Sequence, residues 1–115
     1  MAGTYDFIIE QGADFYREIT YKDASGNPYD VTDYKGKMQL RLEDNSTDVI
    51  TELNDDNGRM RFGGTDGKIY LSIPASDTKD LNFDIAAYDL FVFPQVDKVV
   101  KVLQGTSTLS KAVTK

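Results

Sequence analysis

Apolar and polar residues alternate along most of the chain, and this period of two is the pattern of β-strands that bury one face. Residues 38–42 and 69–73 show the alternation best. Residues 15–21 alternate in the same way, although Arg17 interrupts their apolar face. Shorter stretches predict a strand near Met60 and Phe62 and a closing hairpin from residues 90–93 to 99–103, with Pro94 ending its first strand.

Turn-forming residues separate the predicted strands. Asp, Ser, Gly, Asn and Pro gather at residues 23–28, 55–58 and 63–67, where they favour reversals of the chain. One helical turn is predicted at residues 76–81, which follow Pro74, begin with good N-cap residues and carry Leu81 inward. Seven or eight short strands with one such connection indicate an antiparallel β-sandwich of two sheets, and a small closed barrel is the alternative.

The length of 115 residues predicts one domain, 1–115, with a single hydrophobic core. The longest mostly apolar run, residues 85–93, is interrupted by Asp89 and is far shorter than the roughly 20 residues of a membrane-spanning helix. The first residues lack the basic and apolar segments of an export signal, so we expect the protein to stay in the cytosol of the producing cell. We expect no membrane partner.

The net charge of −6 argues against nucleic acid as a partner, because phosphate binding depends on lysine and arginine. The charges are also unevenly placed along the chain. Lys35, Lys37 and Arg41 precede an acidic stretch at residues 43–56. Solvated strand faces and loops account for this arrangement, and an electrostatic docking patch for a neighbouring subunit is the alternative.

Candidate catalytic or metal-binding residues are few. The chain has no histidine and no cysteine, and its serines lie outside any nucleophile motif, so we expect no enzymatic activity and no cofactor. A weak calcium candidate lies in the first turn, where oxygen-bearing side chains are closely spaced, but no glutamate follows where an EF-hand loop needs one. An ordinary turn explains the same residues, which are Asp23, Ser25, Asn27 and Asp30, with Asp33 beyond them.

One predicted strand is apolar on both faces. In residues 86–93, one face carries Tyr88, Leu90 and Val92, and the other carries Ala87, Phe91 and Phe93. A sandwich strand has one inner face, so a loop or a neighbouring chain must cover the second. We therefore predict an interface at this strand, formed by Tyr88, Leu90, Phe91, Val92 and Phe93.

Short motifs follow one another in a recognisable order over nearly the whole chain. They are Gln-Gly-Ala-Asp-Phe at 11–15, Ser-Gly-Asn-Pro-Tyr-Asp-Val-Thr-Asp at 25–33, Met-Gln-Leu-Arg at 38–41, Gly-Lys-Ile-Tyr-Leu-Ser-Ile at 67–73, Asp-Thr at 77–78, Tyr-Asp-Leu at 88–90 and Leu-Gln-Gly-Thr at 103–106. Their order and spacing resemble those of a family of small virion proteins of tailed bacteriophages. The first half is also similar to the N-terminal domain of upper-baseplate proteins of some phages. Arg17, Val31 and Lys101 depart from that pattern.

The resemblance implies an immunoglobulin-like sandwich that works in assembly and has no catalytic residues. The expected partners are other virion proteins, with several copies of the chain or a homo-oligomer in the particle. The expected location is the virion, and the host cytoplasm during assembly. The extended ends, about residues 1–10 and 106–115, are candidates for docking on a neighbour through strand addition.

Two other functions remain open from the sequence. A capsid decoration or head-fibre anchoring protein would share the fold and differ in its position on the particle. A calcium- or carbohydrate-binding sandwich module belongs to a different class of protein. Seven tyrosines and six phenylalanines favour a sugar platform, whereas the absence of tryptophan argues against one.

Overall fold

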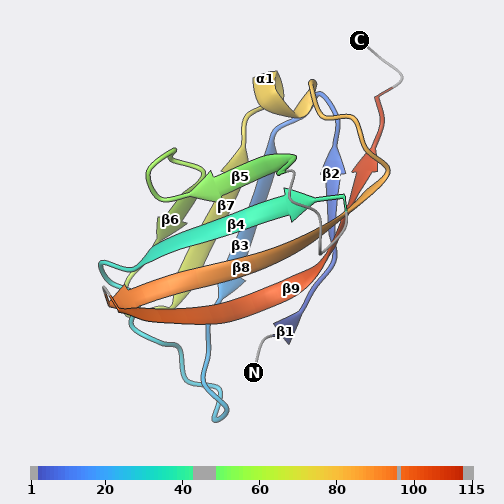
Figure 1. Ribbon diagram of the computed structural model, residues 1–115. Coiled ribbons are helices and arrows are strands. Elements are labelled where there is room, and N and C mark those ends of the chain that lie inside the picture. Colours follow the sequence, from blue (N-terminus) through green and yellow to red (C-terminus); the bar gives the residue numbers. More distant parts are fainter. Residues whose placement is uncertain (1–2, 43–48, 96, 113–115) are drawn as a thin grey trace.

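The protein is an all-β sandwich, described by a computed structural model over residues 3–42, 49–95 and 97–112 (Figure 1). Within those residues it has nine strands in two sheets and one short helix. The smaller sheet has the order β3-β7-β6 and the larger one β1-β9-β8-β4-β5, with β2 also paired to β9. The elements are β1 (Gly3–Thr4), β2 (Phe7–Glu10), β3 (Phe15–Thr20), β4 (Lys35–Arg41), β5 (Thr51–Asn54), β6 (Met60–Phe62), β7 (Lys68–Ile73), α1 (Ala75–Thr78), β8 (Ile85–Gln95) and β9 (Lys98–Ser110).

The core lies between the two sheets, where the inward residues of each strand meet. Leu40 and Leu90 from the larger sheet and Ile69 and Leu71 from the smaller one are fully buried. Gly36 on β4 also faces inward, and a β-carbon there would overlap Met60 Sδ and lie 2.8 Å from Phe62 Cζ. The sheets therefore approach closely at β4, which is why this position has no side chain.

The two ends of the chain pair with each other inside the domain. β1 and β2 run parallel to β9 in one register, since Gly3 pairs with Leu103 and Phe7 with Ser107. Between them the Asp6 carboxylate accepts hydrogen bonds from the Thr106 amide at 3.0 Å and hydroxyl at 3.1 Å. β1 and β2 thus use one of their edges for pairing with β9 inside the same chain.

The turn predicted after residue 21 is confirmed. The Asp23 carboxylate accepts hydrogen bonds from the amides of Ser25 at 2.9 Å and Asn27 at 3.0 Å, and Gly26 has a φ of 85°. An Asx turn followed by glycine at positive φ explains why these residue types occur here. Lys22 and Pro28 form an isolated bridge at its base.

The fold confirms the two-sheet sandwich and excludes the closed barrel, because the strands divide into two sheets. Several details differ from the prediction. The described residues hold nine strands rather than seven or eight. The pairing of β1 and β2 with β9 is parallel. The helix spans Ala75–Thr78 instead of residues 76–81, although Leu81 is buried as predicted. Leu42, placed in a strand by its alternation, follows the end of β4 and is 60% exposed.

Pro94 does not end the first strand of the closing hairpin. β8 continues to Gln95, and the pairing with β9 changes register between Val92 and Gln95. A proline lacks the N–H that a regular ladder needs, so it is tolerated where a strand is irregular. The strand passes through the proline because the ladder is already interrupted there.

Candidate functional site

The strand with two apolar faces is β8, and its faces have different environments. Leu90 and Val92 are fully buried and Tyr88 is 4% exposed, so these three residues belong to the core of the domain. Phe91 and Phe93 lie on the outer face and are partly buried. Of the five residues predicted to form an interface, three therefore pack inside the same chain, and two remain on a surface that a partner can contact.

Lysine side chains on the neighbouring strands flank Phe91. The register places Lys37 of β4 and Lys101 of β9 on either side of it. Lys101 Nζ lies 5.6 Å from the centre of the Phe91 ring and 3.9 Å from the Asp89 carboxylate. Long lysine side chains can cover apolar surface with their methylene groups. This covering is a third possibility that the sequence prediction, a loop or a neighbouring chain, did not include.

Tyr88 ties β8 to the N-terminal strand. Its hydroxyl donates a hydrogen bond to the Tyr5 carbonyl oxygen, and burial, with the nearby Asp6 and Tyr5, raises its pKa. Gly105 lies opposite Tyr88 in β9, and a β-carbon at Gly105 would overlap the Tyr5 carbonyl oxygen. The first strand can approach β9 this closely because residue 105 is glycine.

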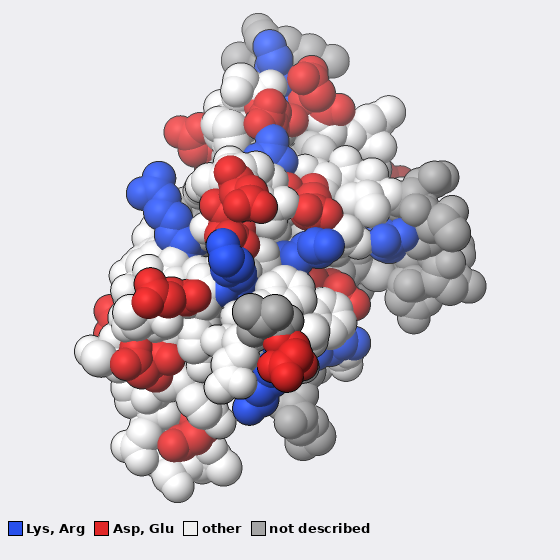
Figure 2. All heavy atoms as spheres, turned by 60° about the vertical axis from the view of Figure 1, so that its left-hand side comes forward, with Lys and Arg blue, Asp and Glu red and all other residues white. Residues whose placement is uncertain are grey.

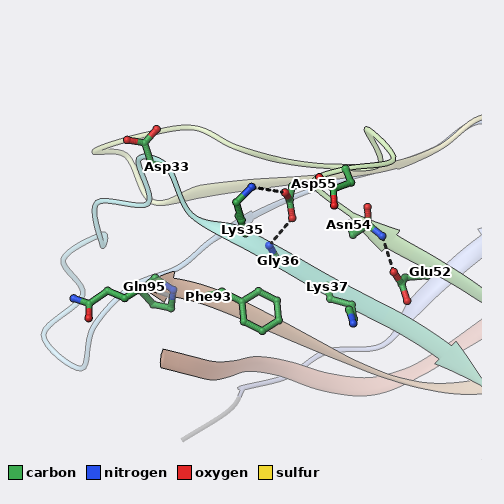
Figure 3. A pocket seen from close by; sticks show the side chains of 11 residues that line it. Asp33, Lys35, Gly36, Lys37, Glu52, Asn54, Asp55, Phe93 and Gln95 are labelled. Atoms are coloured by element: carbon green, nitrogen blue, oxygen red, sulfur yellow. Dashed lines mark hydrogen bonds and ion pairs between the residues drawn. The ribbon is translucent and has the colours of Figure 1, made fainter. Parts of the chain in front are cut away.

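A cleft of about 690 Å³ lies at one end of the larger sheet, between the ends of β4, β5 and β8 (Figure 3). Phe93 lines it from β8, and Lys35 and Lys37 line it from β4. Glu52 and Asp55 line it from the side of β5, so the walls carry both charge signs. The cleft thus combines an aromatic ring with charged groups of both signs.

Two of the carboxylates that line the cleft, Glu52 and Asp55, are held as hydrogen-bond acceptors. Gln39 and Asn54 each donate to Glu52 at 2.6 Å, which lowers its pKa. Burial opposes ionisation of Asp55, but the Gly36 amide at 3.1 Å and Lys35 Nζ at 3.4 Å outweigh it and lower the pKa. Both groups are thus ionised near neutral pH. Neither is prepared as the proton donor that acid catalysis needs.

The uneven charges along the sequence are mixed in space. Asp55 folds back onto Lys35, and Lys37 is near enough to Glu52 to help lower its pKa. Figure 2 shows acidic and basic side chains interspersed over the visible face. An electrostatic docking patch was the alternative explanation for the blocks of like charge in the sequence. In the described residues, these blocks lie beside charges of the opposite sign and form a surface of mixed charge. Glu43, Asp44 and Asp48 of the acidic stretch lie outside the described residues.

The calcium candidate is a set of turn-forming residues. The Asp23 carboxylate accepts the Ser25 and Asn27 amides, and the Asp30 carboxylate accepts the Thr32 amide at 3.0 Å and its hydroxyl at 2.5 Å. Over residues 3–42, 49–95 and 97–112, no three acidic, histidine or cysteine side chains come together as a metal-binding group. The spacing that invited a calcium interpretation is explained by Asx turns.

A second hollow, of about 440 Å³, lies on the outer face of the smaller sheet. Tyr16 of β3, Tyr70 of β7 and Arg61 of β6 line it together with Ser72. Tyr16 is 56% exposed, and burial, together with Asp66 and Glu18, raises the pKa of Tyr70. Two tyrosines and an arginine on one face are groups that stack on and hydrogen-bond to sugars. No local pattern marks these residues, because only the pairing of β7 with β3 and β6 brings them together.

The sequence matches no protein-family model and no curated protein. In the described part of the chain no helix is long and apolar enough to cross a membrane.

Proposed function

We propose that the protein is a non-enzymatic structural component of a tailed-bacteriophage particle, acting in the tail, baseplate or neck. It would be made in the host cytoplasm and be present in the virion in several copies. The observation that carries this proposal is the ordered series of motifs over nearly the whole chain, which resembles small phage virion proteins.

The residues of these motifs contact one another across the fold. The Gly12 amide donates to Thr78 Oγ1 at 3.2 Å, and the Ala75 amide donates to the Asp14 carboxylate at 2.7 Å. Motif residues Gly12 and Asp14, in the connection between β2 and β3, are thus hydrogen-bonded to α1.

The outer face of the larger sheet gives the proposal a physical basis. Phe91 and Phe93 are only partly buried there, and Ile8 and Ile85 are each 57% exposed on the same sheet. Ile8 and Ile85 both pair with Thr108, so they flank one position of β9. Apolar side chains on a sheet surface gain stability when a neighbouring subunit removes them from water.

Mass spectrometry of purified particles tests the proposal directly. We expect the chain in purified virions in more than one copy per particle, and cross-links from its lysines to tail, baseplate or neck proteins. Its absence from purified particles would refute the proposal. Cross-links to the capsid surface would instead favour a decoration or head-fibre anchoring protein.

A carbohydrate-binding module is the second candidate, favoured by the hollow at Tyr16, Tyr70 and Arg61. Titration of the protein with a glycan panel, followed by NMR, would give saturable shifts at this hollow if the candidate is correct. Tyr16→Ala should abolish those shifts, and Tyr29→Ala is the control because Tyr29 is an exposed tyrosine that does not line the hollow. The absence of saturable shifts would refute the carbohydrate-binding candidate and leave assembly as the proposed function.

A further inference from the structure

Among the described residues, strand β3 has one unpaired edge, and its hydrogen bonds to β7 show which edge this is. Tyr21 follows β3 in the same register and donates from its amide to the Gly67 carbonyl oxygen at 2.8 Å. In an antiparallel pair, hydrogen-bonded positions alternate with positions whose N–H and C=O groups point away from the partner. The odd-numbered residues of β3 therefore bond to β7. Tyr16, Glu18 and Thr20 direct their backbone groups to the open side.

The contacts of Arg17 confirm which side is open. Its guanidinium donates to the Tyr16 carbonyl oxygen at 2.7 Å and to the Ile8 carbonyl oxygen of β2 at 3.0 Å. Arg17 thus bridges the free edges of the two sheets near the start of β3. Farther along, the backbone groups of Glu18 and Thr20 have no neighbouring strand, because β7 is the only strand paired with β3 in the described residues.

An apolar groove lies beside this free edge. It has a volume of about 340 Å³ and is lined by Ile19 and Arg17 of β3, by Leu103 of β9, and by Tyr5 and Phe7 from the first strands. Tyr5 is 50% exposed. A strand added to β3 would satisfy the open backbone groups and direct alternate side chains into the groove.

We propose that this edge binds the same edge of a second copy of the chain, so that two β3 strands pair antiparallel about a twofold axis centred on Ile19. In such an arrangement one residue lies opposite itself. A register centred on Arg17 or Glu18 would place like charges face to face, which is unfavourable. A register centred on Thr20, the last residue of β3, would run each strand into the turn that begins beyond Lys22.

The register centred on Ile19 brings complementary side chains together. Ile19 meets Ile19 of the second copy over the groove, and Glu18 lies opposite Thr20. Arg17 lies opposite Tyr21, and its guanidinium can stack on that ring by leaving the Phe15 ring, now 4.9 Å away, and the Tyr16 and Ile8 carbonyl oxygens. Both smaller sheets would join into one continuous sheet of six strands, because each contributes three. This register therefore pairs the two β3 strands without opposing like charges and with both strands short of the turn beyond Lys22.

The proposed dimer deepens the assembly function and rests on it for its biological purpose. The two can fail separately, because pairing is measured on the purified protein and virion membership on the particle. A protein that dimerises but is absent from virions would keep the dimer and lose the phage function. A protein that is present in virions but monomeric when purified would keep the phage function and refute the dimer.

Cysteine cross-linking tests the register, since the natural chain has no cysteine. Single variants Arg17→Cys, Glu18→Cys, Ile19→Cys and Thr20→Cys each place a thiol opposite itself in a different register. We expect mild oxidation to link Ile19→Cys at least tenfold faster than the other three. In the proposed register the two residues 19 form a non-hydrogen-bonded pair, and the Cα atoms of such pairs approach most closely. Ile8→Cys, on the opposite sheet and 57% exposed, is the control. Faster linking at another position, or equal linking at all, would overturn the register.

Sedimentation of the cysteine-free protein tests the dimer itself. We expect a concentration-dependent monomer–dimer equilibrium that Thr20→Pro weakens at least tenfold, since proline removes an N–H directed to the partner and leaves the bonds to β7 intact. Thr20→Ala keeps that N–H and should dimerise like the natural chain. A protein that stays monomeric at all concentrations, or a dimer that Thr20→Pro does not weaken, would overturn the proposal.

Discussion

The two faces of β8 have nearly the same apolar composition and opposite environments. Tyr88, Leu90 and Val92 face the smaller sheet and are buried, whereas Phe91 and Phe93 face outward beside Lys37 and Lys101. A hydrophobic residue on a strand contributes most when another sheet removes it from water. Apolar residues along one strand therefore differ in environment: those on one face pack in the core, and those on the other remain partly exposed.

Truncation of one residue from each face gives the largest expected contrast. Leu90→Ala should lower the free energy of unfolding by about 2–5 kcal/mol, because it leaves a cavity in a fully buried site. Phe91→Ala should cost about 1 kcal/mol or less, because its ring is partly solvated and sits outside the core. Urea unfolding measures both. Equal losses would show that the two faces are energetically alike.

Removal of the Tyr88 hydroxyl tests the link between β8 and the first strand. Tyr88→Phe should destabilise the protein by about 1 kcal/mol, because the hydrogen bond to the Tyr5 carbonyl oxygen is lost while the ring stays packed. Amide hydrogen exchange at β1 should quicken in the same variant. Tyr16→Phe, which changes an exposed ring on the other sheet, is the control and should leave both measurements unchanged.

The lysine that stacks over Phe91 should have a smaller effect. A double-mutant cycle of Lys101→Ala and Phe91→Ala should give a coupling of about 0.5 kcal/mol, as for a partly exposed cation over a ring. The matched pair Lys98→Ala with Phe91→Ala should give a coupling near zero. A coupling of zero in the first cycle would mean that Lys101 does not shield the outer face.

Acid should lower the free energy of unfolding slightly, by protonating Glu52 and Asp55 at the surface of the larger sheet. Hydrogen bonds keep the pKa of Glu52 and of Asp55 lower in the folded protein than their ordinary values of 4.5 and 3.8. Their contribution to stability is thus complete above those values and is lost as the pH falls through the lower, folded pKa. Thermal unfolding from pH 6 to pH 2 would measure it. Glu52→Gln should make the unfolding temperature depend less on pH between 6 and 2. An unchanged pH dependence would contradict a stabilising role of the ionised Glu52.

Local pattern was sufficient to predict most of the strands. The alternation in residues 38–42 and 69–73 located β4 and β7, because a strand with one buried face needs a period of two. The turn at Asp23 was equally predictable, since its residue types form Asx turns. The parallel pairing of the first strands with β9 was not, because partners 100 positions apart share no local signal.

The candidate sites were also predictable only as far as local sequence determines them. The doubly apolar face of β8 was visible in the sequence, but its division into core and surface depended on where the second sheet lies. Glu52 and Asp55 were visible only as part of an acidic stretch, and their place beside Lys35 and Phe93 required the pairing of β4 with β5 and β8. Tyr16 and Tyr70 became neighbours only through the pairing of β3 with β7.

The sequence alone determined an all-β domain, its main strands, its turns and the lack of histidine and cysteine chemistry, because these depend on residue type and short-range spacing. Only the tertiary structure decided that β1 and β2 pair with β9 and that three of the predicted interface residues are core. It also decided that one edge of β3 has no partner strand among the residues that the structure describes. These features depend on which strands become neighbours. Backbone hydrogen bonds and burial select those neighbours across the whole chain, so no local pattern records them.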